Sequence, residues 1–461
     1  MATKAHKRFP CLLKKISLLV SLKRLLHLIA IMKQLSYSYG LSKYALLGET
    51  IGENLRNTCN GYPQREVLIS VHQNYRATYG AFWQQVTNVA KALLALDVKK
   101  GDRVAIWSPN RFEWVLVQYA TARIGAILVN INPAYRISEL AYVLGQSGVS
   151  VLISALAFKS SDYKAMIEES KSLCENLREV IFFDEDWEQF LSKANKISDA
   201  ELEAVESTIQ FDDPVNIQYT SGTTGFPKGV TLSHYNLLNN GYFIGRRLGY
   251  TAEDKVCIPV PFYHCFGMVI GNLCCTSHGA CMVIPSESFE PLRVLEAVEK
   301  ERCTSLYGVP TMFIAELQLP EFSNYNLSSL RTGVMAGSPC PVEVMKKVQS
   351  LMHMKDVQIC YGMTETSPVS TQTLAHTPFE KQVGTVGVGQ DHLEIKIVDP
   401  ETGALQERNI PGELCTRGYS VMLGYWNNAK ATAEAIDQSR WMHTGDLATM
   451  DRRRGSVEDG L

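Results

Sequence analysis

The sequence predicts an α/β fold, because helix-like and strand-like patterns alternate along most of its length. Apolar residues recur at helical spacing over 79–96, 113–124 and 292–300. Strand-like apolar runs stand between or beside these helices, at 104–107, 126–130, 149–153, 180–183, 256–260, 280–284, 305–307, 330–336 and 357–360. Such runs, joined by short turns, are typical of parallel sheets covered by helices.

Two further regions depart from this alternation of helices and strands. The acidic stretch 184–206 is expected to be a solvated helical connection. Beyond residue 390 the strands become shorter and Gly/Pro turns more frequent, which favours a small β-barrel over about 390–450. A chain of 461 residues is long enough for several such units.

Composition places the chain among ordinary globular proteins and excludes some functions. Hydrophobic residues make up 46% and charged residues 20%, and the net charge of −2 gives no electrostatic basis for binding nucleic acid. The twelve cysteines form no C-x-x-C pair and no Cys/His group at the spacing of a metal motif. They are expected to be reduced thiols in a non-oxidising compartment.

The N-terminal segment 1–48 differs from the rest, because it contains nine Lys or Arg and no acid before Glu49. This composition predicts a mitochondrial presequence and delivery to the matrix. A membrane anchor is disfavoured, since Lys14-Lys15 and Lys23-Arg24 divide the apolar run into pieces shorter than the ~20 residues of a spanning helix. A secretory signal built on 16–22 is the alternative, against which the free cysteines argue.

The ten-residue string Thr220-Ser221-Gly222-Thr223-Thr224-Gly225-Phe226-Pro227-Lys228-Gly229 carries the strongest chemical signal. It lies between strand-like runs at 215–219 and 230–232, so it predicts the tip of a hairpin. Glycines allow close backbone approach, hydroxyls add donors and the lysine adds charge, which together suit nucleotide phosphates. Pro227 and the strand after Lys228 exclude a Walker A loop. A polar surface turn is the simpler alternative.

Three later motifs accompany this string, at 361–367 (YGMTETS), 412–418 (GELCTRG) and 444–446 (TGD). Together the four motifs resemble the adenylate-forming (AMP-dependent synthetase/ligase) superfamily over about residues 40–450. Segments 232–236 and 421–426 most resemble the mitochondrial medium-chain branch of the acyl-CoA synthetases, family member 2. The resemblance implies a luciferase-like large N-terminal lobe over 49–450, built from two α/β subdomains and the small β-barrel.

The resemblance also implies roles for individual residues. Ser221, Thr223, Thr224 and Lys228 would hold the outgoing phosphates, within a loop whose nucleotide-binding positions are Thr220, Ser221, Gly222, Thr223, Thr224, Gly225 and Lys228. Tyr361 and Gly362 would line adenine beside Gly337-Ser338-Pro339, and Thr364 would contact the α-phosphate. Glu365 would ligate Mg²⁺, which prefers carboxylate oxygens. Asp446 would accept hydrogen bonds from both ribose hydroxyls.

His264 matches the family position at the mouth of the acyl pocket, where it would orient the substrate carboxylate. The alternative is a structural histidine among aromatic side chains. The segments 266–271, 307–312 and 333–337 would line the acyl tunnel, and their apolar and small residues favour a fatty acyl chain. They contain no acidic residue, which disfavours an amino-acid substrate.

The implied activity joins a medium-chain fatty acid to CoA with ATP and Mg²⁺, through an acyl-adenylate, and catalysis would depend chiefly on Thr364, Glu365, His264 and Lys228. In the family a mobile C-terminal domain follows the lobe and supplies a lysine. Here residues 451–461 diverge from the family pattern and are expected to form a disordered tail. The chain is therefore expected to have impaired activity. The alternative is a catalytically silent lobe that binds ATP and an acyl chain.

Overall fold

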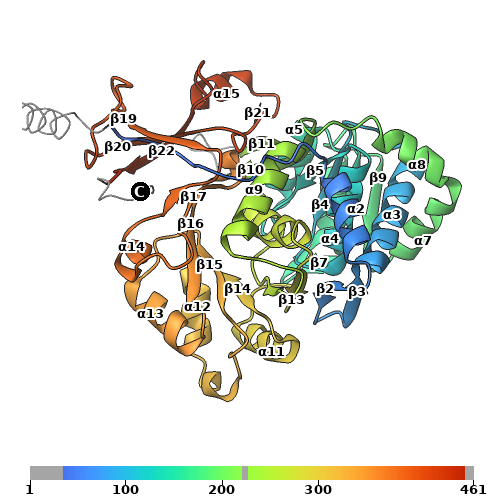
Figure 1. Cartoon of the computed structure of the whole chain (residues 1–461). Coiled ribbons are helices and arrows are strands. Elements are labelled where there is room, and N and C mark those ends of the chain that lie inside the picture. The colour runs from blue at the N-terminus through green and yellow to red at the C-terminus, as the bar shows by residue number, and fades with distance from the viewer. Residues whose placement is uncertain (1–34, 221–226, 452–461) are drawn as a thin grey trace, which may run out of the picture.

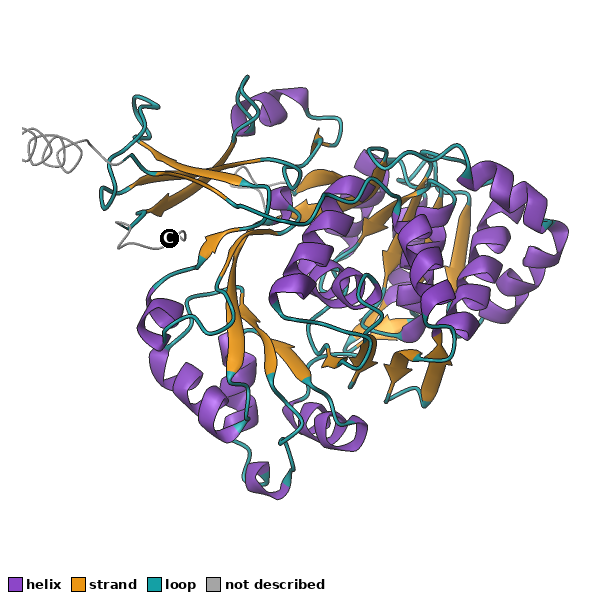
Figure 2. Cartoon of the chain, viewed as in Figure 1, coloured by secondary structure: helices purple, strands orange, loops and turns teal. Residues whose placement is uncertain are grey.

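The computed structural model describes residues 35–220 and 227–451. Their strands form two large sheets, a smaller antiparallel sheet and a short two-stranded hairpin of β7 (Ala157–Phe158) and β8 (Ser161–Asp162). Figure 1 shows the smaller sheet above the two larger ones, at the side where β10, β11 and β17 end. Helices cover the outer faces of both large sheets (Figure 2). The α/β class predicted from the sequence is confirmed.

The first large sheet has seven strands in the order β21-β11-β10-β5-β4-β6-β9. Strands β10, β5, β4, β6 and β9 run parallel, whereas β11 and β21 are antiparallel to their neighbours. The bounds are β4 Arg103–Trp107, β5 Ile127–Asn130, β6 Val151–Ser154, β9 Glu179–Phe182, β10 Pro214–Thr220, β11 Lys228–Ser233 and β21 Gly424–Tyr425. The six strands predicted for this region, 104–107, 126–130, 149–153, 180–183, 215–219 and 230–232, are found within three residues of their expected limits.

The second large sheet has nine strands in the order β18-β17-β16-β15-β14-β12-β13-β2-β3. Their bounds are β2 Glu66–Ser70, β3 Tyr75–Thr78, β12 Lys255–Cys257, β13 Cys281–Ile284, β14 Ser305–Gly308, β15 Thr332–Ala336, β16 Asp356–Gly362, β17 Val369–Gln372 and β18 Val388–Gly389. The strand predicted over 256–260 ends early, at Cys257. Pro259 explains this, because proline has no N–H to donate to a neighbouring strand.

Several helices begin where the sequence supplies a cap. The Thr78 side chain accepts a hydrogen bond from the Ala81 N–H at the start of α3, and α11 opens with Pro291. The helices are α2 Ile51–Gly61, α3 Tyr79–Ala95, α4 Phe112–Arg123, α5 Ile137–Ser147, α6 Tyr163–Lys171, α7 Trp187–Ser192, α8 Asp199–Glu206, α9 His234–Arg247, α10 Cys274–Thr276, α11 Pro291–Glu301, α12 Pro310–Leu317, α13 Val342–Leu351, α14 Phe379–Gly384 and α15 Ala429–Ala435. Within the described ranges, no helix has the length and apolarity needed to cross a membrane.

The acidic stretch 184–206 is helical as predicted, but it is not fully solvated. It contains α7, a 3₁₀ segment Lys193–Lys196 and α8. Trp187, Phe190 and Leu202 are buried, and α7 packs against α3. The acidic residues of this stretch therefore cover one side of helices whose other side completes the core.

The two large sheets share an apolar core that includes α9 and the π-helical segment η2, Phe266–Leu273. Helix α9 contacts β11 of the first sheet and β17 of the second, and η2 packs along α9. Every residue of η2 is buried. This arrangement holds the ends of β10 and β16 on either side of the candidate site.

The smaller sheet confirms the predicted β subdomain and corrects its form. It contains β1 Tyr37–Tyr39, β19 Glu394–Val398, β20 Gly412–Arg417 and β22 Met442–Ala448, in the order β1-β19-β20-β22. Across the described part of the chain, no pairing joins β1 to β22. The four strands thus form an open antiparallel sheet and not the closed barrel that the turn pattern favoured.

Strand β1 also places part of the predicted presequence inside the fold. Tyr37 pairs with Lys396 in antiparallel register, and the Leu47 N–H donates to Asn239 Oδ1 at 2.7 Å. Ser36 is fully buried. The boundary predicted at residue 48 is therefore wrong by at least a strand, since residues 35–48 belong to the folded body. Residues 1–34 lie outside the described residues.

Candidate active site

A cavity of about 440 Å³ opens where the β10–β11 hairpin faces the end of β16. It brings together Thr220, His264 and Thr364, which come from three separate motifs of the sequence. The remaining lining residues are Asn130, Asn132, Tyr135, Glu139, Gln218, Tyr219, Pro227 and Tyr263. Residues at the carboxyl ends of parallel strands commonly form ligand sites in open α/β sheets, as β5, β10 and β16 do here.

The predicted hairpin is confirmed by the pairing of its strands. Thr220 on β10 faces Lys228 on β11 in antiparallel register. The predicted residues Ser221, Gly222, Thr223, Thr224 and Gly225 lie outside the described residues. Lys228 is half-buried, and its Nζ lies 5.1 Å from the centroid of the Tyr425 ring.

Glu365 lies just beyond β16, in the single 3₁₀ turn η4, Thr364–Thr366. Its side chain is buried, and its Oε1 accepts a hydrogen bond of 2.8 Å from the Tyr425 hydroxyl. Burial and the adjacent carboxylate raise the pKa of Tyr425 well above its usual range, so the phenol stays neutral and donates. The Met422 N–H also donates to the Glu365 carbonyl oxygen.

Tyr425 therefore links the two predicted charged residues, and the sequence analysis missed it. It was noted only as part of segment 421–426. It belongs to β21, which pairs with β11, and the Trp426 N–H donates to the Gly229 carbonyl oxygen. A tyrosine 60 residues from its glutamate partner, joined through a third segment, gives no local signal in one sequence.

Tyr361 and Asp446, predicted for adenine and ribose, are hydrogen-bonded to each other. The Tyr361 hydroxyl donates to Asp446 Oδ2 at 2.7 Å, and burial together with this bond raises the pKa of Tyr361. Asp446 itself is exposed on β22. Gly362 has no room for a side chain, because an added Cβ would lie 1.8 Å from the Pro368 carbonyl oxygen.

Gly337, Ser338 and Pro339 follow β15 directly and are exposed. Strand β15 runs parallel to β16, with Ala336 opposite Cys360. The three residues thus lie at the same sheet edge as Tyr361. They are absent from the lining of the 440 Å³ cavity, so the structure places them beside it and not within it.

His264 lies at the surface of the cavity, where its side chain is exposed. The Phe266 N–H donates to its Nδ1 at 3.1 Å, and loss of solvent around the ring lowers the pKa of the imidazole. A neutral ring with Nδ1 as acceptor carries its proton on Nε2. The hydrogen bond from the η2 backbone therefore selects one tautomer.

The three segments predicted to line the acyl tunnel lie together. The rings of Phe266 and Tyr307 are 5.9 Å apart, and Tyr307 on β14 faces Val334 on β15. Phe266, Tyr307 and Val334 are buried. Behind this apolar region, the Cys265 thiol donates to Gln218 Oε1 at 3.1 Å. The predicted tunnel walls are thus neighbours in the structure.

Comparisons with known proteins agree with this geometry. The model of the family described as AMP-binding enzyme matches residues 55–426. The chain is 46% identical over 444 residues to YngI of Bacillus subtilis (strain 168), covering 90% of this chain and 80% of that protein. It is 40% identical over 446 residues to the human mitochondrial medium-chain acyl-CoA ligase ACSF2, covering 91% of this chain and 72% of that protein.

Solved structures give the same fold. The inhibitor-bound N-terminal domain of FACL13 from Mycobacterium tuberculosis superposes with a TM-score of 0.78 at 25% identity, over 87% of this chain and 97% of that chain. The long-chain-fatty-acid-CoA ligase FadD1 from Archaeoglobus fulgidus gives a TM-score of 0.80 at 22% identity, over 91% of this chain and 85% of that chain. The family match and these relatives show that this chain belongs to the AMP-binding enzymes, among the acyl-CoA synthetases.

Proposed function

We propose that this chain activates a medium-chain fatty acid with ATP, forming an acyl-adenylate and pyrophosphate, and that the acyl group then passes to CoA. The observation that carries this proposal is the cavity in which Thr220, His264 and Thr364 meet. Lys228 and Glu365 lie next to it, joined through Tyr425. These residues are of the types needed to hold phosphates, a cation and a carboxylate.

In the activating step, a carboxylate oxygen of the fatty acid attacks the α-phosphorus of ATP. A new acyl–phosphate bond forms, and the bond to the outgoing pyrophosphate breaks. Positioning and neutralisation of charge contribute most of the rate enhancement in such transfers. Lys228 and the hydroxyl-rich loop before it would neutralise the pyrophosphate, and the Thr364 hydroxyl would donate to an oxygen of the α-phosphate.

Glu365 is suited to hold Mg²⁺. Its carboxylate is buried beside the cavity, and the Tyr425 hydroxyl fixes Oε1. A carboxylate offers about four lone-pair sites, so one hydrogen bond leaves room for a cation. Bound Mg²⁺ would neutralise charge on the phosphate oxygens. The Tyr425 hydroxyl would hold the Glu365 carboxylate in a fixed orientation for the ion.

His264 would position the fatty acid carboxylate. Its Nδ1 is occupied by the Phe266 N–H, so Nε2–H is the donor available to a substrate. A neutral donor can hold the carboxylate without neutralising its charge as an imidazolium would. In the alternative, His264 is a packing residue, since its ring lies 6.4 Å from that of Tyr263.

Asp446 and Tyr361 would bind the nucleoside. Tyr361 and Gly362, with Gly337, Ser338 and Pro339 of the neighbouring strand, would enclose adenine at one sheet edge. Asp446 would accept the ribose hydroxyls. Because Tyr361 already donates to Oδ2, the phenol would fix the Asp446 side chain in the orientation that receives ribose.

The substrate class and location rest on different support. The apolar, acid-free segments behind His264 favour a fatty acyl chain, and the medium-chain preference comes from the name of ACSF2. A mitochondrial location is supported by the basic segment at the N-terminus and by the same relative.

The direct test separates the two steps. Purified chain 1–461 is incubated with ATP, Mg²⁺ and octanoate, with and without CoA, and octanoyl-adenylate and octanoyl-CoA are quantified by mass spectrometry. The proposal predicts octanoyl-adenylate in both reactions and octanoyl-CoA when CoA is added. Adenylate without octanoyl-CoA would limit the activity of this chain to the first step. ATP binding with neither product would instead identify a silent nucleotide-binding lobe.

A further inference from the structure

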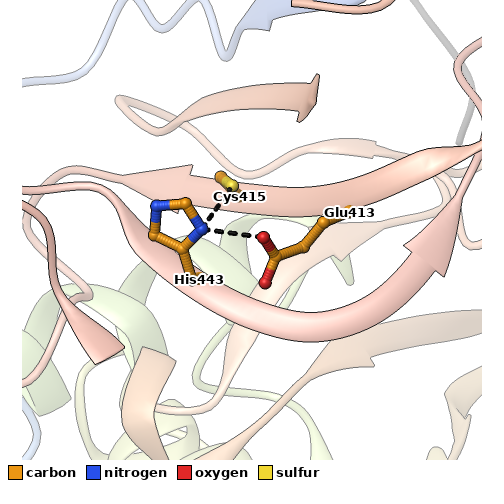
Figure 3. Close-up of side chains that lie close together, drawn as sticks. All are labelled: Glu413, Cys415 and His443. Carbon is orange, nitrogen blue, oxygen red and sulfur yellow. Dashed lines mark hydrogen bonds and ion pairs between the residues drawn. The ribbon is translucent and has the colours of Figure 1, made fainter. Parts of the chain in front are cut away.

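Three side chains with metal-binding atoms meet between β20 and β22, outside the candidate active site (Figure 3). His443 Nδ1 lies 2.8 Å from Glu413 Oε2 and 3.6 Å from Cys415 Sγ. All three ligand atoms lie within 4.8 Å of one another. Glu413 and Cys415 point from the same face of β20, because alternate residues of a strand share a face.

The spacing of these atoms is close to that of ligands around one tetrahedral ion. Zinc–nitrogen and zinc–sulfur bonds of ordinary length place the two ligand atoms about 3.5 Å apart. The observed separation of Nδ1 and Sγ is 3.6 Å. The Glu413–His443 contact is shorter, as expected for a hydrogen bond, and would lengthen by roughly half an ångström around an ion. His443 can make this shift, because 30% of its side chain is exposed.

Two further groups lie where they would orient the ligands of a bound metal ion. Asp437 Oδ2 lies 3.6 Å from His443 Nε2, on the side of the ring away from the cluster. The Gly445 N–H donates to Glu413 Oε1 at 3.0 Å, which leaves Oε2 facing His443. A carboxylate behind a histidine ligand, and a donor behind a carboxylate ligand, fix the orientation of the ligands and favour binding.

We infer that Glu413, Cys415 and His443 form a binding site for Zn²⁺ or a similar thiophilic divalent ion. A thiolate and an imidazole favour zinc over Mg²⁺, which prefers oxygen ligands. Three protein ligands leave a fourth position for water. Binding forms a metal–sulfur bond and releases the Cys415 proton to solvent, so the affinity rises with pH.

The position of the metal site connects metal binding to the proposed binding of the nucleotide. His443 lies in β22, which continues through Thr444 and Gly445 to Asp446, the proposed ribose-binding residue. Thr444 Oγ1 donates to the Leu414 carbonyl oxygen at 2.7 Å, so this part of β22 is already tied to β20. An ion bound to His443 and Glu413 would add a second tie between the two strands. Occupancy would therefore change the affinity of the chain for ATP, while the binding of zinc itself does not depend on the proposed activity.

Sequence spacing could not have revealed this site. Glu413 and Cys415 are two residues apart, but His443 follows 28 residues after Cys415 and reaches them only because β22 pairs with β20. The sequence analysis found no Cys/His group at the spacing of a metal motif. That statement concerns residues close together in the sequence, whereas a sheet can bring distant residues to one place.

The test uses the untagged chain 1–461 with Co²⁺ as a spectroscopic probe and Zn²⁺ in calorimetric titrations. We expect one equivalent of Co²⁺ to give a thiolate-to-cobalt charge-transfer band, which Zn²⁺ then displaces. Cys415→Ser should abolish the band, and His443→Gln should weaken Zn²⁺ binding at least tenfold. Cys340→Ser is the matched control, because Cys340 is the most accessible described cysteine, and it should leave both readouts unchanged.

Each result decides the proposal. The inference is overturned if wild-type protein gives no charge-transfer band, or if Cys415→Ser keeps the band. A band that is lost in Cys340→Ser instead would assign the ion to another cysteine and would also overturn it. His443→Gln guards against misfolding of the buried Cys415→Ser variant, since His443 is partly exposed. Circular dichroism and the melting temperature establish that each variant is folded.

Discussion

The two large sheets place opposite charges next to the same cavity. The seven-stranded sheet supplies Lys228 at the start of β11, and the nine-stranded sheet supplies Glu365 just after β16. Lys228 is half-buried, whereas Glu365 is only 5% exposed. The Lys228 side chain is therefore the more accessible of the two, whereas the Glu365 carboxylate is enclosed and accepts a hydrogen bond from Tyr425.

The difference between Lys228 and Glu365 depends on a third segment of the chain, which contacts both side chains. Tyr425 lies in the two-residue strand β21, which pairs with β11, and its hydroxyl binds Glu365. The same ring lies beside Lys228 Nζ. A short strand at the edge of one sheet thus sets the geometry of a carboxylate carried by the other. Substitution of Lys228, Glu365 and Tyr425 in turn removes the cation, the carboxylate and the hydrogen bond that Tyr425 donates to the carboxylate.

Lys228→Ala should have the largest effect, because it removes the only charge that the hairpin strands bring to the phosphates from within the described part of β10 and β11. We expect adenylate formation to fall by about a hundredfold or more, the scale seen when one charge-stabilising donor is lost. Quantifying octanoyl-adenylate by mass spectrometry measures this. Lys346→Ala, in an exposed ion pair on α13, is the control and should retain full activity.

Glu365→Gln should have the next largest effect, since an amide keeps the shape of the side chain but not its charge. We expect activity to fall by about ten- to a hundredfold and the Mg²⁺ concentration for half-maximal rate to rise. Electron paramagnetic resonance with Mn²⁺ and ATP measures metal binding directly, without turnover. Glu380→Gln, an exposed residue of α14, is the matched control. Unchanged Mn²⁺ binding in Glu365→Gln would show that Glu365 is not a ligand of the metal.

Tyr425→Phe tests the link and should have a smaller effect. It removes one hydrogen bond to a charged group, worth about 1.5 kcal/mol or more, which corresponds to about tenfold. The loss should appear as a higher Mg²⁺ requirement, with nearly unchanged ATP affinity in the absence of metal. Tyr62→Phe, at a tyrosine that is 41% exposed, controls for the substitution. Equal losses with and without metal would mean that Tyr425 supports only the fold.

The sequence was sufficient to predict most strands of the two large sheets, because these strands are buried on both faces. Such strands are continuous apolar runs, and the run 104–107 corresponds to β4, Arg103–Trp107. The sequence did not reveal β2, β3, β17, β18 and β21. The resemblance to the adenylate-forming superfamily assigned Thr220, His264 and Thr364 to one site, and all three line one cavity. Each predicted strand or motif was recognisable within a short stretch of chain.

The remaining features depend on partners far apart in the sequence. Tyr425 meets Glu365 through β21, and Cys415 meets His443 through the pairing of β20 and β22. Strand β1 lies in a basic segment whose composition is typical of a presequence, and only its pairing with β19 reveals its place in the fold. Composition and local spacing carry no information about such contacts.

Glu316 can be compared with Glu365, because it is another buried carboxyl group on the nine-stranded side but has no hydrogen-bond partner among the described residues. Neither of its oxygens has a hydrogen bond within the described residues, and burial raises its pKa well above the usual value. A raised pKa in the folded state gives stability that is complete below the pKa of the unfolded chain. That stability is lost as the pH rises towards the folded pKa.

Glu316→Gln should therefore change stability and leave catalysis within about twofold, the smallest effect on activity. Relative to the variant, the wild type should lose up to about 1.4 kcal/mol of unfolding free energy per pH unit above pH 5, until Glu316 ionises. Urea unfolding at several pH values measures this difference. Parallel pH profiles for the two proteins would show that the Glu316 carboxyl is paired in solution.

Octanoate-dependent exchange between ATP and pyrophosphate, measured on purified chain 1–461 beside Lys228→Ala, tests the central claim most directly. Exchange requires reversible formation of an acyl-adenylate and does not involve CoA. The account predicts exchange that depends on octanoate and Mg²⁺ and falls by about a hundredfold in Lys228→Ala. No exchange from wild-type protein that binds ATP, or equal exchange in the variant, would contradict it.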